Sequence, residues 1–252
     1  MTALVSIGVA GALGPDAIAR IAPEVEAAGF HALWVNDTPD GDALAALAAA
    51  ARTTATLTLA TGVVPVDRRR VAEIARAARH LPHDRLVLGI GSGHARAGAL
   101  ARVRDAVGQL RQHTRARVIV GALGPKMRTL AARDADGPLL SWLTPAAARM
   151  QAADAHREGG HAHVALYVRT ALDPAARSRL EEETDRYAGF PNYAANFARL
   201  DIAAADTVLT PDGFATGIRD YRDAVDEVVL RAITPGDDVA DYAAFIEQAA
   251  RA

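Results

Sequence analysis

The stretch RVIVGALGPKMRTLAARDADGPLLSW, residues 117–142, contains the pattern that decides the fold. It begins with a short apolar run rich in β-branched residues, turns at Gly-Pro-Lys, and continues as a helical pattern to a second apolar run. A proline directly after a glycine turn is a typical helix start. A strand, a helix and a second strand in this order are the building unit of a parallel sheet.

The same unit recurs along almost the whole chain. We count eight apolar runs, at Leu4–Val9, Ala32–Asn36, Leu57–Val64, Leu86–Ile90, Arg117–Gly121, Pro138–Trp142, His163–Arg169 and Glu227–Ile233. Their apolarity is continuous, as expected for strands that are covered on both faces. Eight strands alternating with helices over 252 residues predict an α/β fold, a (β/α)8 TIM barrel.

The connections complete this prediction. The longest one, Asp173–Pro211, is interpreted as a helical insertion between the seventh and eighth strands. No tract rich in proline, glycine and serine divides the chain, so we expect a single domain over residues 1–252. Thr144 followed by Pro145 predicts the start of the sixth helix.

Composition excludes several classes of function. The formal net charge is -2 and the pI about 6.4, so there is no basic field to hold nucleic acid or an anionic membrane. The absence of cysteine excludes disulfides, thiolate zinc sites and a cysteine nucleophile. The N-terminal stretch MTALVSIGVAGALGPD lacks a cationic region, and glycine and proline interrupt its apolar run. We expect a soluble, cytoplasmic protein with a small-molecule substrate and no metal.

Reactive groups of such a barrel belong on the loops after the strands' C-terminal ends. Asn36 and Asp37 follow the second strand, and an Asx turn or helix cap is as good an interpretation of them as a ligand contact. Gly62 ends the third strand where the backbone bends or approaches a ligand. The three arginines at 68–70 have two interpretations, an anion site and a solvated helix face. The solvated face is the commoner role of such a run.

Two glycine turns follow the fourth and fifth strands. The first is GIGSGH, residues 89–94, and includes Ser92, Gly93 and His94; the second is GALGPK, residues 121–126. Glycine turns and helix N-termini present backbone N–H groups to phosphates. The spacing is that of neither a dinucleotide fingerprint nor a P-loop, and no HExxH or GxSxG motif occurs. The two turns together indicate a phosphorylated cofactor.

Four stretches carry a family resemblance: LWVND (33–37), LTLATGVVPV (57–66), DRLVLGIGSG (84–93) and VGALGPKMRTLAARDADGPLLSWLTP (120–145). They resemble the luciferase-like family of flavin- or coenzyme F420-dependent oxidoreductases and monooxygenases. The resemblance runs from Leu4 to Leu143 and resumes at DAVDEVVLRAITPGDD, residues 223–238. The GALGPKM segment is its most specific part.

The resemblance implies a homodimeric TIM barrel that binds FMN or F420 at the C-terminal mouth and moves hydride or activates oxygen at the ring. It implies that the phosphate meets the backbone of Ser92, Gly93 and His94 and that of Leu123 and Gly124. A cis peptide is implied between Gly62 and Val63, in support of the ring. The residues expected around the ring and substrate are Asn36, Asp37, Gly62, His94 and Trp142, with Asp37 and His94 as catalytic candidates.

Two departures from the family stand out. Thr38 follows Asp37 where some F420-dependent members have a histidine. A single predicted helix, Ala95–His113, connects the fourth and fifth strands without the hairpin that most relatives insert. This implies a more open pocket, or one that a partner subunit completes.

Several interpretations stay open. The acidic tail of F420 favours basic residues at the mouth, for which Arg68, Arg69, Arg70 and Lys126 are the candidates. Arg169 and Arg231 are interpreted as neutralising an acidic substrate or the reduced ring, or as structural ion-pair partners. The insertion also contains four aromatic residues, Tyr187, Phe190, Tyr193 and Phe197. Packing or a dimer contact is the favoured interpretation of them, and the lining of an apolar pocket is the alternative.

The function expected first is an F420- or FMN-dependent oxidoreductase that transfers hydride to or from a small organic substrate. The alternatives are an FMN-dependent monooxygenase of the same family and a non-catalytic, cofactor-free barrel that acts as a binding or dimerising protein. A phosphosugar-type barrel enzyme ranks last, because such enzymes bind phosphate at the late loops, whereas these glycine turns follow the fourth and fifth strands.

Overall fold

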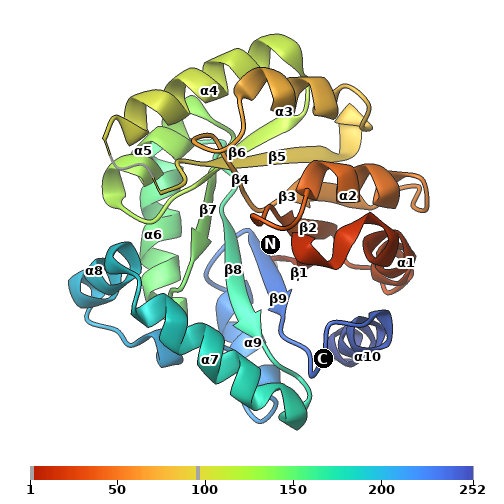
Figure 1. The fold of residues 1–252 in the computed structure, drawn as a ribbon. Coiled ribbons are helices and arrows are strands. Elements are labelled where there is room, and N and C mark those ends of the chain that lie inside the picture. Colours follow the sequence, from red (N-terminus) through yellow and green to blue (C-terminus); the bar gives the residue numbers. More distant parts are fainter. Residues whose placement is uncertain (1–2, 95–96, 252) are drawn as a thin grey trace.

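A computed structural model describes residues 3–94 and 97–251. Its strands form one closed parallel barrel, in which β1 pairs with β2 on one side and with β9 on the other. The barrel strands are β1 (Leu4–Ala10), β2 (Ala32–Asn36), β3 (Thr58–Thr61), β5 (Leu86–Gly91), β6 (Arg117–Gly121), β7 (Pro138–Ser141), β8 (Ala165–Thr170) and β9 (Glu227–Ala232). The predicted (β/α)8 barrel is confirmed (Figure 1).

The strand boundaries differ from the predicted ones where the backbone leaves the ladder. The predicted run Leu57–Val64 divides into β3 and a two-residue strand β4 (Val64–Pro65), which continues the pairing with β5. The predicted run Pro138–Trp142 ends one residue early, because Trp142 has a φ of 57°, outside the range of strands.

The helices surround the barrel (Figure 1). They are α1 (Gly14–Ala27), α2 (Ala43–Ala51), α3 (Val71–Ala78), α4 (Ala99–His113), α5 (Pro125–Asp134), α6 (Pro145–Glu158), α9 (Phe214–Arg222) and α10 (Val239–Ala250). Short 3-10 turns lie at η1 (Gly11–Leu13), η2 (His83–Arg85), η3 (Pro174–Ala176) and η4 (Ala204–Thr207). Thr144 caps α6 by accepting from the amide of Ala147 at 3.3 Å. The predicted helix Ala95–His113 begins at Ala99, and residues 95 and 96 lie outside the described residues.

The insertion between β8 and β9 is helical, as predicted. It contains α7 (Arg177–Ala188) and α8 (Pro191–Leu200), followed by η4. In Figure 1, α7 lies beside the arrowhead of β8, at the C-terminal end of the strands. The insertion therefore lies at the end of the barrel where a site is expected.

Two apolar cores hold the barrel. The larger one lies between the strands and the helices, and the smaller one fills the barrel with inward-facing side chains such as Trp34, Ile119 and Tyr167. Within the described ranges, no helix combines the length and apolarity needed to cross a membrane.

Candidate functional site at the barrel mouth

The inner wall of the barrel is rich in glycine near the strands' C-terminal ends, which we call the mouth. Inward and outward positions alternate along each strand, and the inward positions there include Gly8, Gly62, Gly89, Gly91 and Gly121. Such a wall leaves room for large side chains from neighbouring strands.

Tyr167 and Val63 fill that room. A methyl group on Gly62 would lie 2.2 Å from the hydroxyl oxygen of Tyr167, and one on Gly91 would lie 2.7 Å from Cγ2 of Val63. Both distances are too short for real contacts, so these positions require glycine. Tyr167 and Val63 thereby close the barrel interior and form the floor of the mouth.

The peptide bond between Gly62 and Val63 is cis, which confirms that prediction. The side-chain amide of Asn36 donates to the carbonyl oxygen of Gly62, and the amide of Gly62 donates to the carbonyl of Val35 at 2.8 Å. The structure thus brings together three predicted site residues, Asn36, Gly62 and Val63.

Two buried polar atoms at the floor have no partner within the described part of the chain. They are Oδ1 of Asn36 and the hydroxyl of Tyr167. Burial raises the pKa of Tyr167, so its hydroxyl stays neutral and retains a proton to donate. A buried polar group without a partner is costly, and a ligand that meets these atoms would remove that cost.

Asp37 is already occupied by protein groups. Its fully buried carboxylate pairs with Arg68 and, at 3.2 Å, with Arg69, and it accepts from the amide of Ala43 at 3.1 Å. Arg68 also donates to the backbone carbonyl of Asp37. Asp37 therefore contacts the start of α2 through Ala43, but the N-cap of that helix is Asp42, whose side chain accepts from the amide of Ala45. The catalytic role of Asp37 stays a prediction.

The turn of Ser92, Gly93 and His94 holds a carboxylate from another loop. Oδ2 of Asp67 accepts from the amide of His94 at 2.8 Å, and a methyl group on Gly93 would lie 1.7 Å from Oδ1 of Asp67. The side chain of His94 is exposed. The place predicted for a phosphate is therefore filled by a side-chain anion. Sequence reasoning missed Asp67, which follows β4 in the stretch VPVD and belongs to no motif.

The turn before α5 is open by contrast. Gly124 is the N-cap of α5 and supplies no side-chain cap, and a methyl group on it would meet nothing within 4 Å. The first amides of a helix have no acceptor within the helix. Lys126 is exposed beside them. Leu123 and Gly124 thus border an uncapped helix start at the mouth.

The helical insertion covers one side of the mouth with aromatic rings. Trp142 is 1% exposed, its ring centre lies 4.8 Å from that of Tyr187, and Phe197 meets it edge-on at 6.2 Å. Its indole nitrogen is buried without a partner in the described part of the chain. Tyr187 also packs against Phe190 and Tyr193, which agrees with the packing interpretation of these rings. Trp142 reaches a ligand only if this cover moves.

A cluster of arginines lies under the same cover. The guanidinium of Arg169 lies 4.3 Å from the centre of the Trp142 ring, pairs with Glu183 of α7 at 3.1 Å, and donates to Ser141. These contacts agree with the interpretation of Arg169 as a structural ion-pair partner. Burial raises the pKa of Glu183, but Arg231 and Arg169 outweigh that effect and the pKa is lowered. No sequence motif had pointed to Glu183.

Residues 3–98 match the family model described as luciferase-like monooxygenase. This match makes residues 3–98 similar to luciferase-like monooxygenases. No curated protein sequence matches it significantly.

Solved structures extend the likeness over the whole chain. An F420-dependent tetrahydromethanopterin reductase from Methanopyrus kandleri is 17% identical, with a TM-score of 0.75, and the alignment covers 99% of this chain and 97% of that one. A monooxygenase from Streptomyces bottropensis is 17% identical, with a TM-score of 0.72 and 98% of each chain covered. A riboflavin lyase solved with modified FMN and riboflavin is 11% identical, with a TM-score of 0.69 and coverages of 99% and 90%. At these identities the likeness shows the fold alone.

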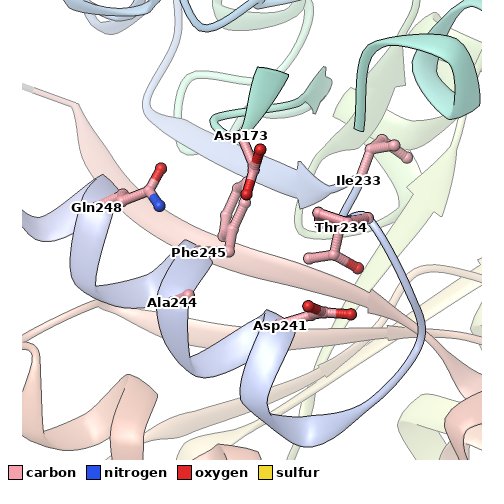
Figure 2. A pocket seen from close by; sticks show the side chains of 8 residues that line it. Asp173, Ile233, Thr234, Asp241, Ala244, Phe245 and Gln248 are labelled. Carbon is pink, nitrogen blue, oxygen red and sulfur yellow. The ribbon is translucent and has the colours of Figure 1, made fainter. Parts of the chain in front are cut away.

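Two further hollows lie away from the floor. A cavity of about 20 Å³ between the end of β9 and α10 is lined by Asp173, Ile233, Thr234, Pro235, Asp241, Ala244, Phe245 and Gln248 (Figure 2). It has room for a single water molecule. A groove of about 260 Å³ lies on the outer side of α5 and α6, lined by Pro125, Arg128, Thr129, Asp154, Ala155, Arg157 and Glu158. The groove also has a buried nitrogen without a partner among the described residues, Nε of Arg128. The mouth remains the candidate site, because the unpartnered atoms of Asn36 and Tyr167 lie at the C-terminal ends of the strands, where the sites of such barrels are built.

Proposed function

We propose that the protein is an oxidoreductase that binds the ring of F420 or FMN on the floor of Val63 and Tyr167. The observation that carries the proposal is the glycine wall around these two side chains, together with the unpartnered atoms of Asn36 and Tyr167. The likeness to an F420-dependent reductase and to a lyase solved with modified FMN supports both cofactors. When bound, such a ring supplies the hydride chemistry.

The chain's own residues orient the ring and exclude water. Asn36 holds the backbone of Gly62 with its amide nitrogen and leaves its oxygen as an acceptor for the ring. Tyr167 offers a neutral hydroxyl as a donor. The aromatic cover over Trp142 keeps solvent from one side of the mouth.

The fit to the phosphate differs between the two turns. Asp67 fills the turn of Ser92–His94, so a phosphate there would compete with its carboxylate. The uncapped start of α5 at Leu123 and Gly124 is open, and it is the turn we propose for the phosphate. Arg68 and Arg69 are engaged by Asp37, so an acidic F420 tail would meet Lys126 first.

Fluorescence titration with FMN, F420 and riboflavin tests this proposal. We expect micromolar binding of FMN or F420. Gly124→Asp places a carboxylate at the open turn and should weaken FMN binding about tenfold or more while leaving riboflavin binding unchanged. The matched control is Gly108→Asp, because Gly108 lies on the exposed face of α4 with open space around it. If Gly124→Asp and Gly108→Asp weakened FMN binding equally, phosphate binding at the start of α5 would be contradicted.

Two other functions compete with this one. A cofactor-free binding barrel is favoured by Asp67 in the first phosphate turn, and absence of binding of both FMN and F420 at high concentration would support it and refute the oxidoreductase. The FMN-dependent monooxygenase is favoured by the family model, and oxygen uptake by the protein with reduced FMN would identify it. The proposal includes a cytoplasmic homodimer, for which sedimentation gives the oligomeric state.

A further inference from the structure

One carboxylate at the mouth faces three guanidinium groups. Glu183 lies 3.1 Å from Arg169, 3.7 Å from Arg186 and 4.0 Å from Arg231, measured between nitrogen and oxygen. The side chains of Arg169 and Arg231 are only 7% and 14% exposed, whereas that of Arg186 is 62% exposed. In the described ranges, Glu183 is the carboxylate that pairs with Arg169 and Arg231. Two mostly buried positive charges therefore share one negative charge.

The excess positive charge resides on Arg231. Arg169 is held by Glu183 and Ser141 and stacks on Trp142. Arg231 donates through Nη1 to the carbonyl of Ala232, but its Nη2 is 4.0 Å from Glu183, beyond hydrogen-bond distance. A guanidinium that is mostly out of water without a full partner is unfavourable. An anion bound beside Arg231 would offset this cost by supplying the missing partner.

Unpartnered hydrogen-bond donors surround the same place. The hydroxyl of Tyr167 is buried without a partner among the described residues. Tyr167 and Arg231 both border Gly8, because a methyl group on Gly8 would lie 2.7 Å from Cε1 of Tyr167 and 3.4 Å from Cα of Arg231. The indole nitrogen of Trp142, under Arg169, is buried without a partner as well. Arg231 stands one inward position above Val229 on β9, so it faces the mouth.

We propose that Arg231 binds a carboxylate group of a small anionic substrate at the mouth, with Arg169 as a positioning residue and Glu183 as a competing carboxylate of the protein itself. The planar guanidinium offers parallel N–H groups that match a carboxylate. The side chain that already stands against the arginines, Glu183, is itself a carboxylate. This deepens the proposed function by naming the substrate class, but the binding of the anion is measurable without any cofactor.

The test is a titration with succinate at constant ionic strength, followed by NMR of the two indole N–H signals. The protein has two tryptophans. Trp142 adjoins Arg169. The indole N–H of Trp34 donates to Glu227 at the start of β9 and is an internal control. We expect a saturable shift of the Trp142 signal and an unchanged Trp34 signal.

Three variants decide the outcome. Arg231→Gln should weaken succinate about tenfold or more, because a charge-assisted hydrogen bond is lost. Glu183→Gln should tighten it several-fold, because the competing carboxylate is removed; a purely structural ion pair would not produce this gain. Arg149→Gln, on the exposed face of α6, is the matched control and should leave binding unchanged.

The proposal is overturned if succinate gives no saturable shift up to about 100 mM, a range that detects millimolar binding. Equal weakening by Arg149→Gln and Arg231→Gln would also overturn it, since that shows a nonspecific charge effect. Inorganic phosphate is titrated in parallel, and tighter binding of phosphate than of succinate would refute the carboxylate class. Failure of the cofactor titrations would leave these results unaffected, so the two proposals fail separately.

Discussion

Glu227 at the closed end of the barrel gives the sharpest prediction of stability. Glu227 is 1% exposed, and its carboxylate accepts from the hydroxyl of Ser6 at 2.6 Å and from the indole nitrogen of Trp34 at 2.7 Å. Nε2 of His163 lies 2.8 Å from its other oxygen. The carboxylate therefore joins β1, β2, the approach to β8 and β9 inside the barrel.

The expected loss of unfolding free energy in each variant follows from the number of hydrogen-bond partners that the variant loses. Glu227→Gln keeps a carbonyl oxygen for Ser6 and Trp34 and loses one charge-assisted contact, which costs about 1.5–3 kcal/mol of unfolding free energy. Glu227→Leu also leaves both donors buried without an acceptor, and we expect a total of about 3–5 kcal/mol. The difference between the two variants is the informative quantity, because both remove the same charge.

Urea unfolding followed by circular dichroism measures these losses. Glu182→Gln, an exposed carboxylate on α7, is the control and should change little. Losses below about 0.5 kcal/mol for both Glu227 variants, the range of ordinary surface substitutions, would refute the reasoning. Equal losses would show that Ser6 and Trp34 find other acceptors.

The pH dependence provides a second check on Glu227. Burial raises its pKa, but contacts with His163, Ser6 and Trp34 outweigh burial and leave the pKa below the ordinary value of 4.5. A carboxyl with a lowered folded pKa stabilises the fold fully above its unfolded pKa and loses that effect as the pH falls through the folded pKa. The stability gap between wild type and Glu227→Gln should therefore be constant near neutral pH and narrow below about 4.5.

Three further predictions concern other contacts. Gly62→Ala should lower the free energy of unfolding by about 1–3 kcal/mol, because its methyl group overpacks against Tyr167. A double-mutant cycle with Tyr167→Leu should show coupling between the two positions, and additive losses of stability would exclude the contact. Tyr167→Phe should change stability by no more than about 0.5 kcal/mol, or raise it, since its hydroxyl has no partner, and a large loss in urea unfolding would reveal a missed one. The Glu26 carboxyl, which accepts from the backbone of Thr56, Leu57 and Ala55, should titrate near a pKa of about 2 by carbon NMR; an ordinary value would mean that these bonds are absent in solution.

The local pattern of the sequence was enough for the barrel. Continuous apolar runs such as Arg117–Gly121 and helix starts such as Thr144–Pro145 are properties of neighbouring residues, and they placed nearly every strand and helix. The cis peptide at Gly62–Val63 was predicted from the family resemblance and is present. The boundaries failed where one residue adopts an unusual backbone angle, as at Trp142.

The contacts at the mouth were decided by the tertiary structure alone. Asp67 reaches the turn of His94 across 27 residues, and Glu183 reaches Arg231 from a helix of the insertion. Neither residue belongs to a motif, because electrostatic pairing depends on distance in space and not on spacing along the chain. The sequence by itself therefore determined the barrel and which strand ends meet at the mouth. Only the folded chain decided which of the charges there are already paired, and so which remain for a ligand.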